Sequence, residues 1–127
     1  MLFADSLVAP QLMDAESFDF EIVGGHTAKG YWVARVDVAD VKRYKRYIAA
    51  DAKPFAKYGA RFLVRAGQFQ APEGTSRSRH VVIEFPTYQA ALDCHNCPEY
   101  QEAFKLRLPA STADLILVED YDGPQPT

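Results

Sequence analysis

The sequence has few cysteines, no long apolar run and no basic start, and each of these shortages excludes a class of protein. Its two cysteines, Cys94 and Cys97, lie three positions apart and form no disulfide framework of a small secreted domain. No apolar run approaches the roughly 18 residues of a membrane-spanning helix. Residues 1–28 hold five acidic residues and no Lys or Arg, so they lack the basic region of a secretory signal. We therefore expect a soluble, cytoplasmic protein.

Several motifs of well-known enzyme classes are also missing. The chain has no Gly-rich phosphate loop, no HExxH motif and no Ser-centred nucleophile elbow, which argues against nucleotide-dependent, zinc-peptidase and α/β-hydrolase chemistry. Residues 29–127 carry 14 basic and 12 acidic residues, so neither nucleic acid nor an anionic membrane is an indicated partner. We expect no cofactor and no resident metal.

The length and composition that remain are those of one globular domain. The chain has 127 residues, of which 48% are hydrophobic and 24% charged. The acidic residues 1–28 differ from the rest and form an N-terminal extension, followed by a single domain over 29–127. In the extension, Phe18, Phe20 and Ile22 alternate with acidic residues, as in an edge strand. A disordered tail or a non-native start explains the same segment equally well.

The domain shows strands and helices in the order β-α-β-β-α-β. The predicted strands are 30–38, 60–70 with a break at 66–67, 78–85 and 113–121. Asp40 caps the first helix, which contains Pro54 and ends at Gly59, while Thr87 caps a short helix and Cys97 precedes another. This order over about 95 residues predicts a ferredoxin-like α+β fold, in which the helices cover one face of an antiparallel sheet.

Alternation along the strands predicts which side chains face the helices. The helix-facing set is Trp32, Ala34, Val36, Phe62, Val64, Val81, Ile83, Phe85, Ile116 and Val118. The opposite set mixes apolar and charged residues: Tyr31, Val33, Arg35, Arg61, Leu63, Arg65, His80, Val82, Glu84, Leu115, Leu117 and Glu119. Such an apolar open face would be a large exposed patch on a monomer, so we expect it to pair with a second copy in a homodimer.

Five segments together resemble one known family. They are GYWVARVDV, FAKYGARFLVRAG, RHVVIEFPTYQAAL, CPEYQEAF and ILVEDYDGPQP. Over nearly all of residues 29–126 the chain is similar to domain-of-unknown-function family 1330 of the dimeric α+β barrel superfamily, and departs from it at Cys97, where we expect Ser. The resemblance implies a ferredoxin-like protomer whose sheet closes a barrel with its mate. It implies no single activity, because the superfamily includes cofactor-independent monooxygenases, haem-degrading oxygenases, small isomerases and ligand-binding proteins.

Charged residues on the open face form the first candidate site. His80, Arg65 and Glu84 are candidate catalytic residues, and Arg35 is a candidate ligand-binding residue. The reason is that His titrates near neutrality and Arg binds carboxylates with two hydrogen bonds. The alternative, which we favour, is that these Arg and Glu residues pair across neighbouring strands and between protomers.

The second candidate site is an aromatic pocket between the sheet and the helices. Trp32, Tyr44 and Tyr100 are its candidate ligand-binding residues, although aromatic residues at helical spacing are more often part of the core. The spacing of Cys94 and Cys97 can hold half a zinc site or a redox pair. We favour a simpler interpretation, in which Cys97 caps a helix and Cys94 packs as a small hydrophobe.

Two functions of different classes therefore stay open. The first is a homodimeric binding or structural module of undetermined activity. The second is a cofactor-independent enzyme, monooxygenase-like or isomerase-like, that acts on an aromatic or enolisable metabolite with His80 as base and Arg65 or Arg35 as anion clamp. A cavity between sheet and helices that is reached from solvent, with His80 or Tyr100 at its wall, distinguishes the second function from the first.

Overall fold

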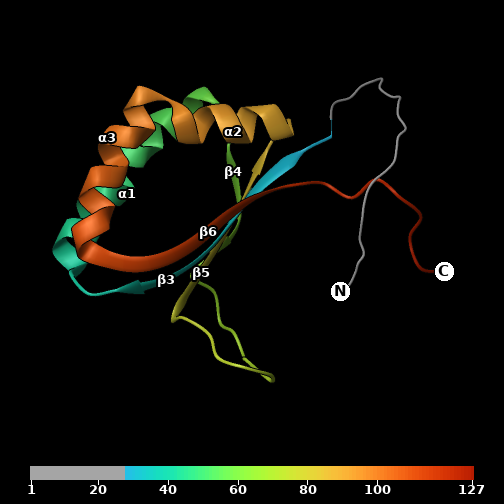
Figure 1. The fold of residues 1–127 in the computed structure, drawn as a ribbon, viewed down its shortest axis with the longest axis horizontal. Coiled ribbons are helices and arrows are strands. Elements are labelled where there is room, and N and C mark those ends of the chain that lie inside the picture. The colour runs from blue at the N-terminus through green and yellow to red at the C-terminus, as the bar shows by residue number, and fades with distance from the viewer. Residues whose placement is uncertain (1–27) are drawn as a thin grey trace.

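A computed structural model describes residues 28–127, so the alternating segment at Phe18, Phe20 and Ile22 lies outside the described residues. The elements are β3 (Gly30–Val38), α1 (Val41–Lys57), β4 (Arg61–Arg65), β5 (Arg79–Phe85), α2 (Tyr88–Asn96), α3 (Pro98–Arg107), the 3₁₀ turn η1 (Leu108–Ala110) and β6 (Ser111–Glu119). The helices lie together on one side of the sheet (Figure 1). The predicted α+β order is confirmed.

The sheet has the strand order of a ferredoxin-like fold. Its order is β4-β5-β3-β6, and every neighbouring pair is antiparallel. The two strands that each precede a helix, β3 and β5, are therefore central. Strand β3 passes close to α2 at Gly30, where an added Cβ would lie 2.6 Å from the Cα of Tyr88. Only glycine fits this approach.

The helices begin at the predicted capping residues. The side chain of Asp40 accepts a hydrogen bond from the Arg43 amide (3.1 Å), and the Thr87 hydroxyl accepts one from Ala90 (2.9 Å). Helix α1 continues through Pro54 to its last residue, Lys57. The caps fix where each helix starts, and with it which side chains face the sheet.

Strand β4 contains a bulge that reverses the predicted facing of its second half. Phe62 faces the helices as predicted, but the register shifts between Phe62 and Val64. After the shift, Val64 pairs with Val82 of the open face, while Arg65 pairs with Val81 of the helix face. The extra residue of a bulge inverts the alternation beyond it. The placement of Arg65 on the open face was therefore wrong.

Strand β6 also faces the opposite way to the prediction. Leu115 and Leu117 pair with helix-facing residues of β3, whereas Ile116 is 58% and Val118 41% exposed. Both alternating sets of this strand are aliphatic, so the pattern alone does not choose between them. In the observed register, the charged Asp114 lies on the open face with Ile116 and Val118.

The core lies between the sheet and the helices. Its largest fully buried side chains include Tyr100, Phe85 and Cys94. Leu108 of η1 is 58% exposed, while Arg107 at the end of α3 is buried. Within residues 28–127, no helix is both long and apolar enough to cross a membrane.

Candidate functional site

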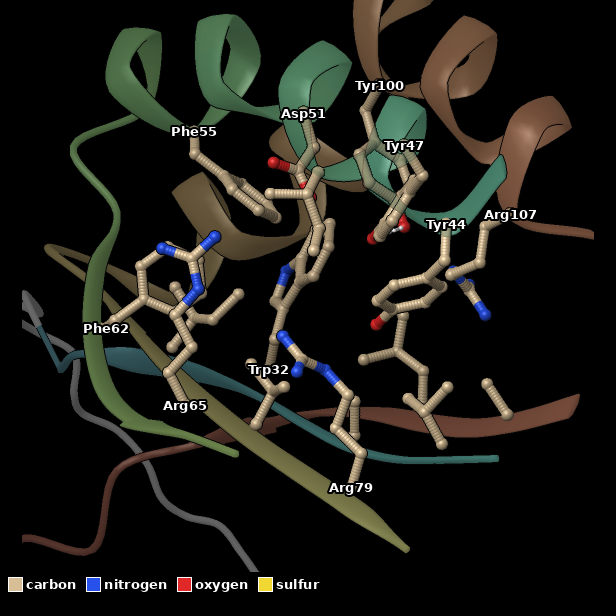
Figure 2. Close-up of a pocket in the computed structure, with 17 residues that line it drawn as sticks. Trp32, Tyr44, Tyr47, Asp51, Phe55, Phe62, Arg65, Arg79, Tyr100 and Arg107 are labelled. Carbon is tan, nitrogen blue, oxygen red and sulfur yellow. Dashed lines mark hydrogen bonds between the residues drawn. The ribbon is translucent and has the colours of Figure 1, made fainter. Parts of the chain in front are cut away.

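A cavity lies in this core between the sheet and the helices (Figure 2). It leaves about 40 Å³ for the centres of water-sized molecules, which is room for about three waters as the side chains lie. Its aromatic wall residues are Trp32, Tyr44, Tyr47, Phe55, Phe62 and Tyr100. A cavity walled by flat rings suits a small planar ligand.

Trp32 forms the centre of the aromatic wall and is held in one orientation. Its indole Nε1 donates a hydrogen bond to the backbone carbonyl of Ala91 at 2.9 Å. The rings of Tyr100 and Phe55 pack edge-on against it, with centroids 4.8 and 5.2 Å away. The hydrogen bond uses the only polar atom of the indole, so Trp32 offers the cavity an apolar surface.

Two tyrosine hydroxyls meet beside this wall. Tyr47 of α1 and Tyr100 of α3 are both buried, and their hydroxyl oxygens lie 2.9 Å apart. Burial, reinforced by the neighbouring phenol, raises the pKa of Tyr47 well above its usual value, and burial also raises the pKa of Tyr100. Both side chains therefore stay neutral near pH 7 and act as hydrogen-bonding groups.

Three arginines from three different elements line the same cavity: Arg65 of β4, Arg79 of β5 and Arg107 of α3. The guanidinium of Arg65 lies 4.0 Å from the ring centroid of Phe62, and that of Arg79 lies 5.3 Å from the ring of Tyr44. Within residues 28–127, none of the three forms a salt bridge. The Nε atom of Arg79 is buried without a hydrogen-bond partner. These positive groups are available to an anion.

One carboxylate faces the three arginines. Asp51 occupies the apolar stripe of α1 between Tyr47 and Phe55 and is only 5% exposed. Figure 2 shows Asp51 and Arg79 approaching the cavity from opposite sides, α1 and β5. Burial raises the pKa of Asp51 to about 7, although the arginines act in the opposite direction. Its protonated and charged forms are therefore both populated near neutral pH.

Four of the seven predicted site residues line this cavity, namely Trp32, Tyr44, Tyr100 and Arg65. Arg65 is exposed whereas Trp32 and Tyr100 are buried, so the cavity extends from the surface into the core. Tyr100 lies at the wall of this cavity, whereas His80 does not.

The other three predicted residues, His80, Glu84 and Arg35, lie on the open face of the sheet. Glu84 forms salt bridges with Arg61 (3.5 Å) and Lys29 (3.4 Å), and Arg35 forms one at 3.2 Å with Asp114 of the neighbouring strand. Of the predicted pairs of Arg and Glu across neighbouring strands, Arg61–Glu84 forms, whereas Arg35 pairs with Asp114 and Arg65 forms no salt bridge within residues 28–127.

His80 belongs to a small cluster of its own on that face. Its Nε2 lies 2.7 Å from the Ser76 hydroxyl, and its ring lies 4.3 Å from that of Phe69. Its Nδ1 is buried without a hydrogen-bond partner in the described part of the chain. The sheet separates this cluster from the aromatic cavity.

Four further residues line the cavity that were not predicted as site residues, namely Tyr47, Asp51, Arg79 and Arg107. A usable signal was present for the charged ones. Asp51 lies at helical spacing within the apolar stripe of α1, and Arg79 alternates in phase with the core residues of β5. A charged side chain at a core-facing position indicates a buried polar site.

The two cysteines have the structural roles that we favoured. The Sγ of Cys97 accepts a hydrogen bond from the Tyr100 amide at 3.3 Å and so caps α3. Cys94 is fully buried, and burial raises the pKa of its thiol to about 12. Within residues 28–127, no three His, Cys, Asp or Glu side chains are grouped so that they could hold a metal ion.

Comparisons with solved structures support the fold. The RPA0582 protein of unknown function from Rhodopseudomonas palustris is 18% identical, with a TM-score of 0.62 over 77% of this chain and 86% of that chain. SnoaB, a cofactor-independent oxygenase from Streptomyces nogalater, is 15% identical, with a TM-score of 0.53 over 76% and 96%. A dimeric ferredoxin-like protein of unknown function from Thermobifida fusca is 13% identical, with a TM-score of 0.51 over 80% and 99%. At such identities the likeness shows the fold alone.

A comparison with curated proteins finds no match. The family described as "Domain of unknown function (DUF1330)" matches residues 29–121, which is most of the chain. The match covers every strand and helix described above and agrees with the ferredoxin-like fold. The chain therefore belongs to the DUF1330 family, whose activity is not established.

Proposed function

We propose that this protein binds a small, planar organic anion, such as a single-ring carboxylate, in the cavity between sheet and helices. The observation that carries the proposal is the set of three guanidiniums, Arg65, Arg79 and Arg107, that line an aromatic cavity without a salt bridge in the described part of the chain. Arg107 is buried, Arg79 is half-buried with an unpartnered Nε, and none of the three has a carboxylate partner in the described part of the chain. An anion that enters the cavity supplies that partner.

The chemistry of the walls favours a flat carboxylate over other anions. A guanidinium binds a carboxylate with two parallel hydrogen bonds, and aromatic rings pack well against a planar ligand. As the side chains lie, the cavity holds only a few waters, so a ring must displace these waters and move the longer side chains. The side chain of Arg65 can move aside for the ligand because it is exposed and its aliphatic stem is long.

Phenylpyruvate, a single-ring 2-oxo acid, tests the proposal against its uncharged methyl ester. We expect calorimetric titration to show binding of the acid and at least tenfold weaker binding of the ester. Arg79→Gln removes a charge-assisted hydrogen bond and should weaken binding of the acid by roughly 10- to 100-fold. Arg61→Gln, on the open face, is the matched control and should leave the affinity unchanged. Equal affinities for acid and ester would contradict the proposal.

The second part of the proposal is that two copies pair through their open sheet faces. Four large aliphatic side chains are exposed on or beside this face, Leu63 (44%), Val64 (40%), Ile116 (58%) and Val118 (41%). Such a patch favours burial against another surface. The face also carries charges of both signs, so it does not repel its own copy. The dimeric protein from Thermobifida fusca, similar in fold, supports this assembly.

Native mass spectrometry tests the assembly and reports any retained small molecule in the same spectrum. We expect a dimer for the natural sequence and a monomer for Ile116→Asp, because a buried unpaired carboxylate at the interface is costly. Val41→Asp, at an equally exposed aliphatic residue on α1, is the control and should stay dimeric. A monomeric natural protein contradicts the pairing.

We also propose a cytoplasmic location, because two unpaired cysteines suit a reducing compartment.

A further inference from the structure

The cavity holds one feature that anion binding does not require, namely the Asp51 carboxyl group. A carboxylate repels an anionic ligand, so a site built only to hold an anion gains nothing from it. Asp51 is nonetheless buried there, and no hydrogen bond or salt bridge within residues 28–127 occupies it. A buried carboxyl group without a partner, next to groups suited to binding an anion, is a candidate for proton transfer.

We propose that Asp51 is the general base of a proton-transfer reaction on a ligand that carries a carbonyl group and an adjacent C–H bond. This inference rests on the proposed anion binding, because the arginines must first hold the ligand beside Asp51. It extends that function from binding to the catalysed tautomerisation of an enolisable carboxylate.

The reaction needs no oxidant, reductant or cofactor. The Asp51 carboxylate takes the proton from the carbon next to the carbonyl, so a C–H bond breaks and an O–H bond forms on Asp51. The electron pair of the C–H bond becomes the C=C bond of an enolate, and the negative charge moves to the former carbonyl oxygen. Guanidinium groups stabilise that charge. Return of the proton to the enolate oxygen gives the enol, and its return to carbon regenerates the ketone.

The polar groups that line the cavity with Asp51 include no second carboxyl group within residues 28–127. They come from four elements: Tyr44 and Tyr47 of α1, Arg65 of β4, Arg79 of β5, and Tyr100 and Arg107 of α3. Arginines stay charged and donate only, and the buried pair Tyr47 and Tyr100 has raised pKa values. The pKa of Asp51, raised to about 7 by burial, lies where general bases work best at neutral pH.

The experiment follows deuterium uptake into the methylene group of phenylpyruvate in D₂O by proton NMR. We expect the natural protein to raise the exchange rate at least tenfold above that in buffer, in proportion to protein concentration. Asp51→Asn keeps the shape of the side chain but removes the base, so the protein-dependent rate should fall roughly 10²- to 10⁴-fold. Its affinity for phenylpyruvate should stay the same or rise, since one negative charge is lost.

Asp93→Asn on the exposed side of α2 is the matched control and should change neither exchange nor binding. Where Asp51→Asn fails to fold, as judged by circular dichroism, Asp51→Glu replaces it and should lower the exchange rate at retained affinity. Exchange at the buffer rate in a natural protein that binds phenylpyruvate overturns the base and leaves the binding function intact. Equal binding of acid and ester instead overturns the binding function itself.

Discussion

The two faces of the same sheet hold acidic and basic side chains in opposite states. On the open face, the Asp114 carboxylate accepts hydrogen bonds from Arg77 (2.8 Å) and Arg35 (3.2 Å), although about half of its side chain is exposed. On the other side of the sheet, Asp51 of α1 is almost fully buried and has no such partner in the described part of the chain. The half-exposed Asp114 is thus paired, while the buried Asp51 is not.

This distribution is the reverse of what stability alone favours. Buried charges are usually paired, because desolvation is expensive, and exposed charges need no partner. A site that breaks this rule while the surrounding core obeys the packing rules is a candidate functional site. Pairing and burial, more than residue type, therefore distinguish the candidate binding residues from the structural ones.

The largest effect should come from removing the buried charge itself. The pKa of Asp51 is about 7 in the folded protein against an ordinary 3.8. A raised pKa means that folding favours the protonated form of Asp51. The contribution of Asp51 to the free energy of unfolding is therefore complete below pH 3.8 and is lost as the pH rises through about 7. At about 1.4 kcal/mol for each of roughly three pKa units, Asp51→Asn should be more stable than the natural protein by up to about 4 kcal/mol above pH 8.

Urea unfolding of both proteins between pH 4 and pH 9, at one protein concentration, checks this. The difference in the free energy of unfolding should be near zero at pH 4 and should grow as the pH rises. The two curves running parallel over the whole range would show that Asp51 is solvated or paired in the folded protein. The contrast between the two faces would then disappear.

A smaller effect should follow from the buried tyrosine pair. The hydroxyls of Tyr47 and Tyr100 hydrogen-bond each other at 2.9 Å, so Tyr100→Phe leaves the Tyr47 hydroxyl buried without that partner. Such a loss costs about 1 to 3 kcal/mol, and the double change to Phe should cost less than the sum of the two single changes. Tyr121→Phe is the control, because Tyr121 is 63% exposed and its hydroxyl donates to the Pro124 carbonyl at 2.7 Å. Additive single and double changes would contradict a coupled pair.

Most of the fold follows from local sequence signals. The caps at Asp40, Thr87 and Cys97 start helices where predicted, and the alternation in β3 and β5 assigns both sheet faces correctly. The two errors arise where local pattern carries little information. A bulge in β4 depends on pairing with β5, and the two aliphatic sets of β6 are told apart only by pairing with β3.

The site was harder to predict because it depends on contacts between distant segments. Aromatic pocket residues such as Trp32 and Tyr100 were found from their residue types and positions. Arg65 was assigned to the wrong face because the bulge reverses it. Asp51 was missed although its place in the apolar stripe of α1 indicates burial, whereas the burial of Arg107 depends on how α3 packs. The unpaired state of these charges is a property of the tertiary structure.

The smallest effect, and one of opposite sign, should come from the paired carboxylate of the open face. The hydrogen bond from Arg77, together with the charge of Arg35, lowers the pKa of Asp114 below its ordinary value of 3.8. The stabilising contribution of Asp114 is therefore present above pH 3.8 and is lost as the pH falls through the lowered pKa. In the monomeric Ile116→Asp background, where this face contacts water, Asp114→Asn should lower the melting temperature slightly at pH 7, and 1 M NaCl should reduce the difference. In the dimer that we propose, the same change should be less sensitive to salt, because a second copy packed on this face would exclude water from the network. A pH dependence with the same sign as that of Asp51→Asn would contradict the assignment of opposite electrostatic states to the two faces.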